Sequence, residues 1–184
     1  MSEKYKVFDS KMPHFITITV VGWVDVFTRP NYTTILDQSI KYCITSKGLI
    51  VLAYVYMTNH IHLIVRSEEN KIQDIVRDFK KFTSKALIKE IESSNESRKV
   101  WMLNKFSFEA DKTKRGVKYK FWQDGFHPIV LDKNYLLEQK LDYIHQNPVK
   151  AGFVNNAEDW KNSSAKSYMM DDKTICIFEI DFIR

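Results

Sequence analysis

The sequence predicts a single α+β domain of the ferredoxin-like kind, in which helices pack on one face of an antiparallel sheet. Alternating, β-branched segments at 14–22, 49–57 and 60–67 are typical of strands, and an amphipathic pattern at 71–92 is typical of a helix. The order strand, helix, strand, strand, helix, strand, followed by a further helix, is that of a ferredoxin-like sandwich. We expect one domain over 1–184, with a core at about 12–154, an insertion at about 93–120 and a C-terminal tail at about 155–184.

The first half of the chain supplies three of the expected strands. A helix is predicted at about 31–46, where Ile35, Ile40 and Cys43 fall near helical spacing after Pro30. Gly48 ends it, and the strongly apolar run 49–57 follows as a strand. Thr58 and Asn59 form a candidate turn, from which 60–67 returns beside the preceding strand.

The second half alternates helices with less regular segments. The helix at 71–92 has a regular apolar face, whereas 93–120 is polar and basic and is interpreted as an insertion or mobile loop. A strand is predicted at 126–131, and a helix at 134–146 that Pro148 stops. The tail ends in an apolar, strand-like segment at 176–183.

Composition limits the function classes. The 184 residues are 44% hydrophobic and carry a net charge of +5, which is a weak pointer to a polyanionic partner such as nucleic acid. Cys43 and Cys176 form no CxxC or CxxH pair, so a thiolate zinc site is not expected. The polar N-terminus is not a signal peptide and no apolar run reaches about 20 residues, so we expect a cytoplasmic protein without a membrane partner.

His60-Ile61-His62 is the first candidate site. Residues i and i+2 of a strand point to the same face, so both imidazoles project together while Ile61 points into the opposite layer. Two imidazoles on one rigid strand can hold a divalent cation. The alternative is a pair of surface histidines near a hairpin turn, but the apolar neighbours after His62 favour a buried, central strand.

Tyr143 and Asn147 are the second candidate site. They are spaced i and i+4 in a predicted helix and therefore share a face. A tyrosine hydroxyl can act as a nucleophile that forms a covalent intermediate, and an asparagine carbonyl oxygen can complete a cation's ligand shell. The alternatives are a packed aromatic for Tyr143 and a helix C-cap for Asn147.

Four segments, taken together, resemble the IS200-like transposases of the HUH type, and among them the REP-associated tyrosine transposase branch. They are HFITITVVGW (14–23), YVYMTNHIHLIVRS (54–67), KFWQDGFHPIVL (120–131) and LDYIHQNPVKAGFV (141–154). The stretch AEDWKNSSAKSY (157–168) fits the usual tail of that branch. The resemblance covers most of 14–168, and its motifs occur in the expected order.

The resemblance implies an enzyme that cleaves single-stranded DNA at hairpin or palindromic repeats and transfers the strand through a 5′-phosphotyrosine link. It implies that His60 and His62 bind a divalent cation, Mg²⁺ or Mn²⁺, and that Tyr143 is the nucleophile. Asn147 stands where related enzymes place a longer glutamine that reaches the metal. No nucleotide cofactor is needed, because the protein–DNA ester keeps the energy of the broken bond. The family includes dimers, and this branch is compatible with a monomer or a homodimer.

Basic and aromatic residues are candidates for DNA contact. Arg77, Lys81, Lys85 and Lys89 step by four along one face of the predicted helix, and lysines also gather at 112–120. Trp122 could stack on a base and His127 could touch DNA. The alternatives are a solvated helix face and a packed aromatic. His145 is about 200° round the helix from Tyr143, so we expect it to point away from the site.

Two other functions remain open from the sequence. One is a DNA-binding regulator that kept the fold and lost turnover, which the presence of His60, His62 and Tyr143 argues against. The other is a metallonuclease that uses water as its nucleophile. Such an enzyme would form no covalent adduct and would tolerate the loss of Tyr143.

Overall fold

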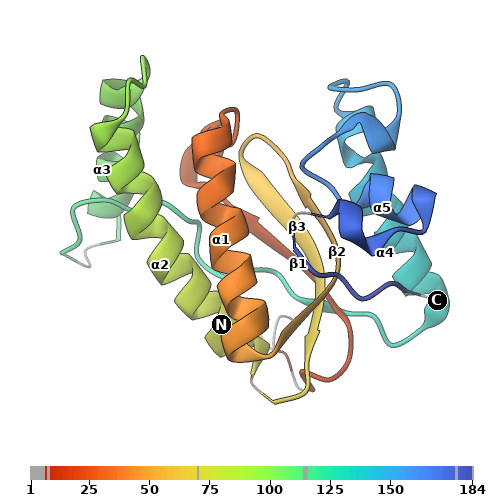
Figure 1. Ribbon diagram of the computed structural model, residues 1–184. Coiled ribbons are helices and arrows are strands. Elements are labelled where there is room, and N and C mark those ends of the chain that lie inside the picture. The colour runs from red at the N-terminus through yellow and green to blue at the C-terminus, as the bar shows by residue number, and fades with distance from the viewer. Residues whose placement is uncertain (1–6, 8, 70, 114–115, 177, 184) are drawn as a thin grey trace.

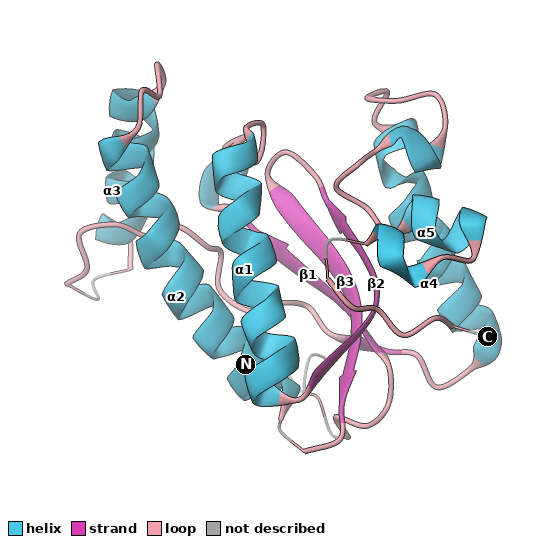
Figure 2. Cartoon of the chain, in the orientation of Figure 1, coloured by secondary structure: helices cyan, strands magenta, loops and turns pink. Residues whose placement is uncertain are grey.

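The computed structural model describes residues 7, 9–69, 71–113, 116–176 and 178–183. Its centre is a sheet of four strands in the order β2-β3-β1-β4, with every neighbouring pair antiparallel. In Figure 1 the sheet stands between two groups of helices, and Figure 2 separates the strands from the helices by colour. The α+β class and the antiparallel sheet expected from the sequence are confirmed.

The sheet register decides which side chains share a face. β1 (His14–Thr19) and β2 (Leu49–Tyr56) flank β3 (His60–Ser67), so β3 is an interior strand. Thr17 of β1 lies opposite His62 of β3. β2 and β3 are joined by residues 57–59, and the hydrogen bond from Met57 N to His60 O closes this turn (2.8 Å).

β4 (Ile129–Val130) is shorter than the strand predicted at 126–131. Its two residues pair with Phe15 and His14 at the edge of the sheet. His127 has a φ of 46°, which lies in the left-handed region and interrupts an extended chain. The segment still follows β1 on both sides of this kink, because Thr17 N donates to Phe126 O (2.9 Å).

α1 (Pro30–Lys47) and α2 (Ile72–Ser93) cover one face of the sheet. Both agree closely with the helices expected at 31–46 and 71–92. Their apolar faces pack on alternate strand residues in the larger core, among them Ile61, Leu63 and Val65 of β3. Gly48, with a φ of 66°, ends α1, and its N–H donates to Cys43 O.

α4 (Asn134–Lys150) lies on the opposite face, with the short helix α5 (Ala165–Met170) beside it (Figure 1). A smaller core joins this helix to the sheet and includes Phe15, Ile64 and Ile144. The 3-10 turn η3 (Ala157–Asp159) follows α4 in the chain. α4 thus packs on the sheet face that α1 and α2 leave free.

The region 93–120, interpreted from the sequence as a loop, contains the helix α3 (Lys99–Asp111). Met102, Phe106 and Ala110 are its buried residues. They are spaced by four, which gives a narrow apolar stripe among polar and exposed residues. The interpretation of the whole stretch as an irregular loop was wrong. Only one residue per turn of α3 is buried, so the amphipathic pattern was too weak to indicate a helix.

The end of α4 and the tail also differ from expectation. Pro148 lies inside α4 and does not stop it, and the chain leaves the helix near Gly152, which has a φ of 75°. Proline removes only its own N–H, and Ala151 N still donates to Asn147 O one turn later (3.0 Å). The described part of 176–183 forms no strand, since Phe178 and Ile180 are instead buried in the larger core.

The described helices include none with the length and apolar character needed to cross a bilayer. Both cysteines are free: Cys43 of α1 is buried in the larger core, and Cys176 is half-buried. Burial raises the pKa of the Cys43 thiol to about 11, so it is protonated and unreactive at neutral pH.

Candidate catalytic and metal-binding site

His60 and His62 lie together on the face of β3 that α4 covers. Their ring centroids are 4.7 Å apart at an interplanar angle of 76°. His62 is almost completely buried and stacks on Phe15 of the neighbouring strand, with 5.1 Å between the ring centroids. The structure therefore confirms that the two imidazoles project to one face from an interior strand, while Ile61 lies in the opposite core.

A hydrogen-bonded chain fixes the His60 ring. The Asn59 side-chain amide donates to Asp25 Oδ1 (2.8 Å), and this directs Asn59 Oδ1 towards His60 Nδ1, 2.7 Å away. Because that oxygen can only accept, His60 Nδ1 carries the proton and Nε2 keeps a lone pair. Thr58 Oγ1 also donates to Asp25 Oδ1 (2.6 Å), which holds the carboxylate in place.

His62 has the matching arrangement. Its Nδ1 lies 2.8 Å from Thr17 Oγ1, and its Nε2 is buried with no hydrogen-bond partner among the described residues. In the tautomer whose Nδ1 donates to Thr17 Oγ1, Nε2 keeps a lone pair. A buried ring nitrogen without a partner is free to take a metal ion or a water molecule.

Both imidazoles are held neutral. Burial lowers the pKa of His60, and it lowers the pKa of His62 to about 3, with smaller contributions from the nearby charges of His60 and Lys140. Neutral imidazole is the form that binds metal ions, so the pair is ready to act as ligands at physiological pH.

Tyr143 on α4 reaches the same place. Its ring centroid lies 5.3 Å from that of His62 and 5.7 Å from that of Phe15, edge-on to both. The residue is 37% exposed, so a DNA strand can approach it. The predicted nucleophile and the predicted ligand pair thus meet, although 81 to 83 positions separate them in the chain.

Lys140 belongs to this cluster and was missed from the sequence. Its Nζ lies 4.8 Å from the ring centroid of Phe15 and 5.3 Å from that of Tyr143. Lys140 and Tyr143 are spaced i and i+3 on α4, which places them on one helix face, and this spacing could have identified it. The ammonium group brings a positive charge to the position where a phosphate would approach Tyr143.

Asn147 lies one turn after Tyr143 on α4 and is half-buried. No group of three His, Cys, Asp or Glu suited to a metal occurs in the part of the chain that the structure describes. The histidine pair therefore needs ligands of another kind to complete a shell. Asn147 stays a predicted ligand.

His145 and His127 play different parts. His145 Nε2 lies 3.0 Å from Ser164 Oγ, the ring packs against Tyr168, and burial lowers its pKa to about 4. It points away from the Tyr143 site, as expected. His127 is exposed at the kink before β4, so its proposed contact with DNA stays a prediction.

Trp122 does not offer a face to a base. It is 5% exposed, its Nε1 donates to Thr83 Oγ1 (3.0 Å), and its ring packs against Phe27, Phe79 and Phe121. The prediction that Trp122 stacks on DNA was wrong, because composition alone does not separate a core aromatic from an exposed one. Its function is to pack α2 against the segment that leads to β4.

The predicted basic face of α2 divides into two parts. Arg77 forms ion pairs with Asp74 (2.6 Å) and Asp78 (3.2 Å), which reduce its charge towards a phosphate. Lys81, Lys85 and Lys89 line a groove of about 880 Å³ between α2 and 117–125. Three further lysines line it, against two carboxylates: Lys80, Lys118 and Lys120 against Glu92 and Asp124.

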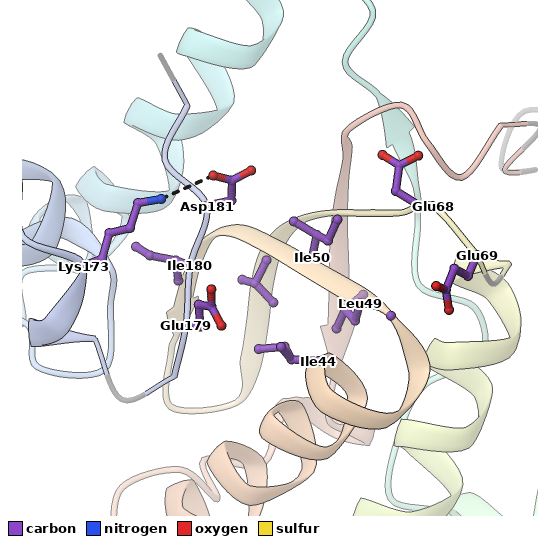
Figure 3. Close-up of a pocket in the computed structure, with 11 residues that line it drawn as sticks. Ile44, Leu49, Ile50, Glu68, Glu69, Lys173, Glu179, Ile180 and Asp181 are labelled. Carbon is purple, nitrogen blue, oxygen red and sulfur yellow. Dashed lines mark hydrogen bonds and ion pairs between the residues drawn. The ribbon is translucent and has the colours of Figure 1, made fainter.

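A second hollow has the opposite charge. Figure 3 shows a pocket of about 420 Å³ between the end of α1, the start of β2 and the C-terminal tail, where Lys173 contacts Asp181. Its lining contains four carboxylates, those of Glu68, Glu69, Glu179 and Asp181, and none of the site residues above. Four carboxylates would repel a phosphate, so this pocket does not suit a nucleic-acid ligand.

The family described as "Transposase IS200 like" matches residues 10–115, which is more than half of the chain. The chain belongs to this family. The matched region contains β1, β3 and the histidine pair, whereas Tyr143 and Asn147 lie beyond it.

Two similar proteins extend this finding. A Haemophilus influenzae protein described as a REP-associated tyrosine transposase is 32% identical over 116 residues, which cover 61% of this chain and only 57% of that relative. A solved structure of a REP-associated tyrosine transposase bound to a REP hairpin superimposes with a TM-score of 0.68. The superposition covers 100% of this chain and 94% of that one. The sequence identity is 19%, so this similarity shows the fold alone.

Proposed function

We propose that the chain is a tyrosine transposase that cuts and rejoins single-stranded DNA at hairpin-forming repeats. The observation that carries the proposal is the position of Tyr143 beside the neutral pair His60 and His62. Membership of the IS200-like family supports it. A relative of the same fold is bound to a REP hairpin, which favours hairpin DNA as the partner.

In the proposed reaction the Tyr143 oxygen attacks the scissile phosphorus. A tyrosine O–P bond forms and the P–O3′ bond breaks, so the phenol loses its proton and the leaving oxygen departs as a 3′-hydroxyl. The DNA on the 3′ side stays attached to the protein through a 5′-phosphotyrosine. Attack by another 3′-hydroxyl on this ester reverses the step and joins two strands without an external energy source.

The residues present fit a divalent cation. The lone pairs on Nε2 of His60 and His62 share one face, and the buried Nε2 of His62 lacks any other partner in the described chain. Asn147 Oδ1 is the proposed third protein ligand. A bound cation supplies positive charge to a non-bridging phosphate oxygen. Of Mg²⁺ and Mn²⁺, a site with two imidazoles suits Mn²⁺ better, because Mg²⁺ prefers oxygen ligands.

The groove between α2 and 117–125, here called the lysine groove, is the proposed binding site for the duplex stem of the hairpin. Lys81, Lys85 and Lys89 would neutralise phosphates without reading sequence. The segment 117–126 leads from this groove to the edge of β1, where Phe126 O accepts from Thr17 N (2.9 Å). Thr17 is also the partner of His62, so a DNA strand following this segment would approach the histidine pair.

We propose that one chain carries out the chemistry, because Tyr143, His60 and His62 lie together in the same chain. A monomer is therefore the simplest functional unit, and a homodimer would add DNA-binding surface rather than catalytic groups.

The test is a strand-specific adduct assay with hairpin oligonucleotides from the DNA that flanks the gene. With a label at the 3′ end, the proposal predicts an SDS-resistant protein–DNA band in Mn²⁺. With a label at the 5′ end, it predicts a free, shortened strand that ends in a 3′-hydroxyl. Cleavage without any adduct would indicate the water-using metallonuclease, and binding without cleavage would indicate the DNA-binding regulator.

A further inference from the structure

Trp23 is an exposed aromatic residue beside the histidine pair. It belongs to the 3-10 turn η2 (Val21–Trp23), which directly follows β1, and it is 60% exposed. Its ring lies edge-on to His60, with 5.7 Å between the centroids. Most of a large apolar side chain is therefore in solvent at the edge of the candidate catalytic site, where packing does not account for it.

The backbone holds Trp23 in an unfavourable conformation. Gly22 has a φ of 62° and Trp23 a φ of 54°, so two successive residues adopt the left-handed region. Glycine adopts a positive φ freely, whereas a residue with a bulky side chain is sterically destabilised there. Backbone strain of this kind persists only where the surrounding structure enforces it, and it occurs most often at functional sites.

Hydrogen bonds between Asn59 and residues on either side of Gly22 hold this turn in place. Val20 N donates to Asn59 O (2.9 Å), and the Asn59 side-chain amide reaches Trp23 O (3.4 Å). Asn59 is also the residue whose Oδ1 holds His60 Nδ1. The same residue thus holds the Trp23 main chain and the adjacent imidazole of His60.

A cation lies next to this platform. The Lys105 side chain of α3 crosses the backbone of Gly22 so closely that a Cβ at Gly22 would collide with its Cε. Lys105 is 3.7 Å from Glu109, a long ion pair that leaves the ammonium group able to meet a phosphate. An exposed indole beside a lysine is the combination that binds a single-stranded nucleotide, through its base and its backbone.

We propose that Trp23 is a stacking platform for a nucleobase of the single-stranded flank, next to the scissile phosphate. This inference rests on the proposed function, because it names the part of the DNA that the same site holds. Stacking on a tryptophan face is tolerant of base identity, so Trp23 positions the strand at His60 without reading its sequence. It differs from Trp122, whose ring is buried in the core.

The experiment measures binding in EDTA, where the proposed function predicts no cleavage. 2-Aminopurine, whose fluorescence falls on stacking, is placed at each position of the single-stranded flank in turn. For the wild-type protein, one or two positions show strong quenching. Trp23→Asn removes the ring and keeps a residue that tolerates a positive φ. This variant should lose the quenching and bind the flanked hairpin about 10-fold more weakly, whereas Trp23→Phe should keep most of both.

Two controls separate stacking from a structural role. Phe82 on α2 is 63% exposed and lines a hollow with Ser39 and Tyr42 of α1, so Phe82→Ala should leave both quenching and affinity unchanged. A blunt hairpin without the flank should bind Trp23→Asn as it binds the wild type. Undiminished quenching in Trp23→Asn, or an equal loss for blunt and flanked hairpins, would overturn the inference.

The result is independent of the covalent chemistry. Tyr143→Phe should retain the quenching, because stacking does not require the nucleophile. If the wild type forms no adduct but the Trp23-dependent quenching is present, the proposed reaction fails and the binding role of Trp23 stands. If adducts form and Trp23→Asn binds normally, only the role of Trp23 fails.

Discussion

The two faces of the sheet differ in chemistry although the same strands build both. On β3, Ile61, Leu63 and Val65 point towards α1 and α2, where they pack in the larger core. His60 and His62 point the other way, towards α4. Polar side chains on an interior strand cost free energy unless they are bonded, so this alternation indicates a site on the α4 face, beside the smaller core.

The largest effect on DNA cleavage is expected from substitutions on the sheet face that carries His60 and His62. Replacing His60 and His62 by alanine should abolish DNA cleavage, because the two Nε2 lone pairs are lost together. Circular dichroism should show an intact fold. Titration calorimetry with Mn²⁺ should detect binding to the wild type and none to the variant. Full cleavage in excess EDTA would show that the pair has another use.

A substitution on the other face should separate stability from function. Leu63→Ala removes a buried side chain from the larger core and should lower the free energy of unfolding by about 2–5 kcal/mol. Chemical denaturation measures this loss. At a temperature where the variant is folded, adduct formation per folded molecule should match the wild type. A strong loss of activity in the folded variant would mean that the two faces are coupled.

The residues behind the histidines should have an intermediate effect. Asn59→Ala removes the acceptor of His60 Nδ1, so the ring is no longer fixed and the affinity for Mn²⁺ should fall about 10- to 100-fold. Thermal unfolding measures the loss of stability separately, since the Asn59 side chain also bonds Asp25 and the Trp23 main chain. Raising the Mn²⁺ concentration should restore cleavage. A defect that excess metal does not correct would contradict a positioning role.

The smallest effects are expected in the lysine groove. Single alanine substitutions of Lys81, Lys85 and Lys89 should each weaken hairpin binding and flatten the log–log salt dependence by roughly one unit. Arg77→Ala should change it less, because Asp74 and Asp78 already pair with Arg77. An unchanged slope for all three lysines would mean that this face is only solvated.

Local patterns were sufficient to predict much of the site. The i, i+2 spacing on a strand placed His60 and His62 on one face, and the i, i+4 spacing on a helix placed Tyr143 and Asn147 together. Spacing along the chain could not predict that β3 and α4 meet, because their contact depends on how α4 packs on the sheet. The family resemblance supplied that link, and the structure brings the Tyr143 and His62 rings to 5.3 Å.

The features that were missed depend on contacts between distant segments. Asp25 orients Asn59 from 34 positions away, and nothing in the neighbourhood of either residue marks the pair. Trp23 and Trp122 are both tryptophans after apolar residues, yet one is 60% exposed and the other 5%. Trp23 lies in a left-handed turn at the surface whereas Trp122 packs in the larger core, and no hydrophobic pattern separates the two.

The central claim is that Tyr143, and no other of the nine tyrosines, forms the covalent link to DNA. Tyr135 is the matched control, since it lies two turns earlier on α4 and is 61% exposed. Mass spectrometry of the digested adduct should find the nucleotide on the peptide that contains Tyr143. Tyr143→Phe should form no adduct while Tyr135→Phe forms it normally. A nucleotide on a Tyr135 or Tyr56 peptide, or cleavage by Tyr143→Phe at the wild-type rate, would contradict the account.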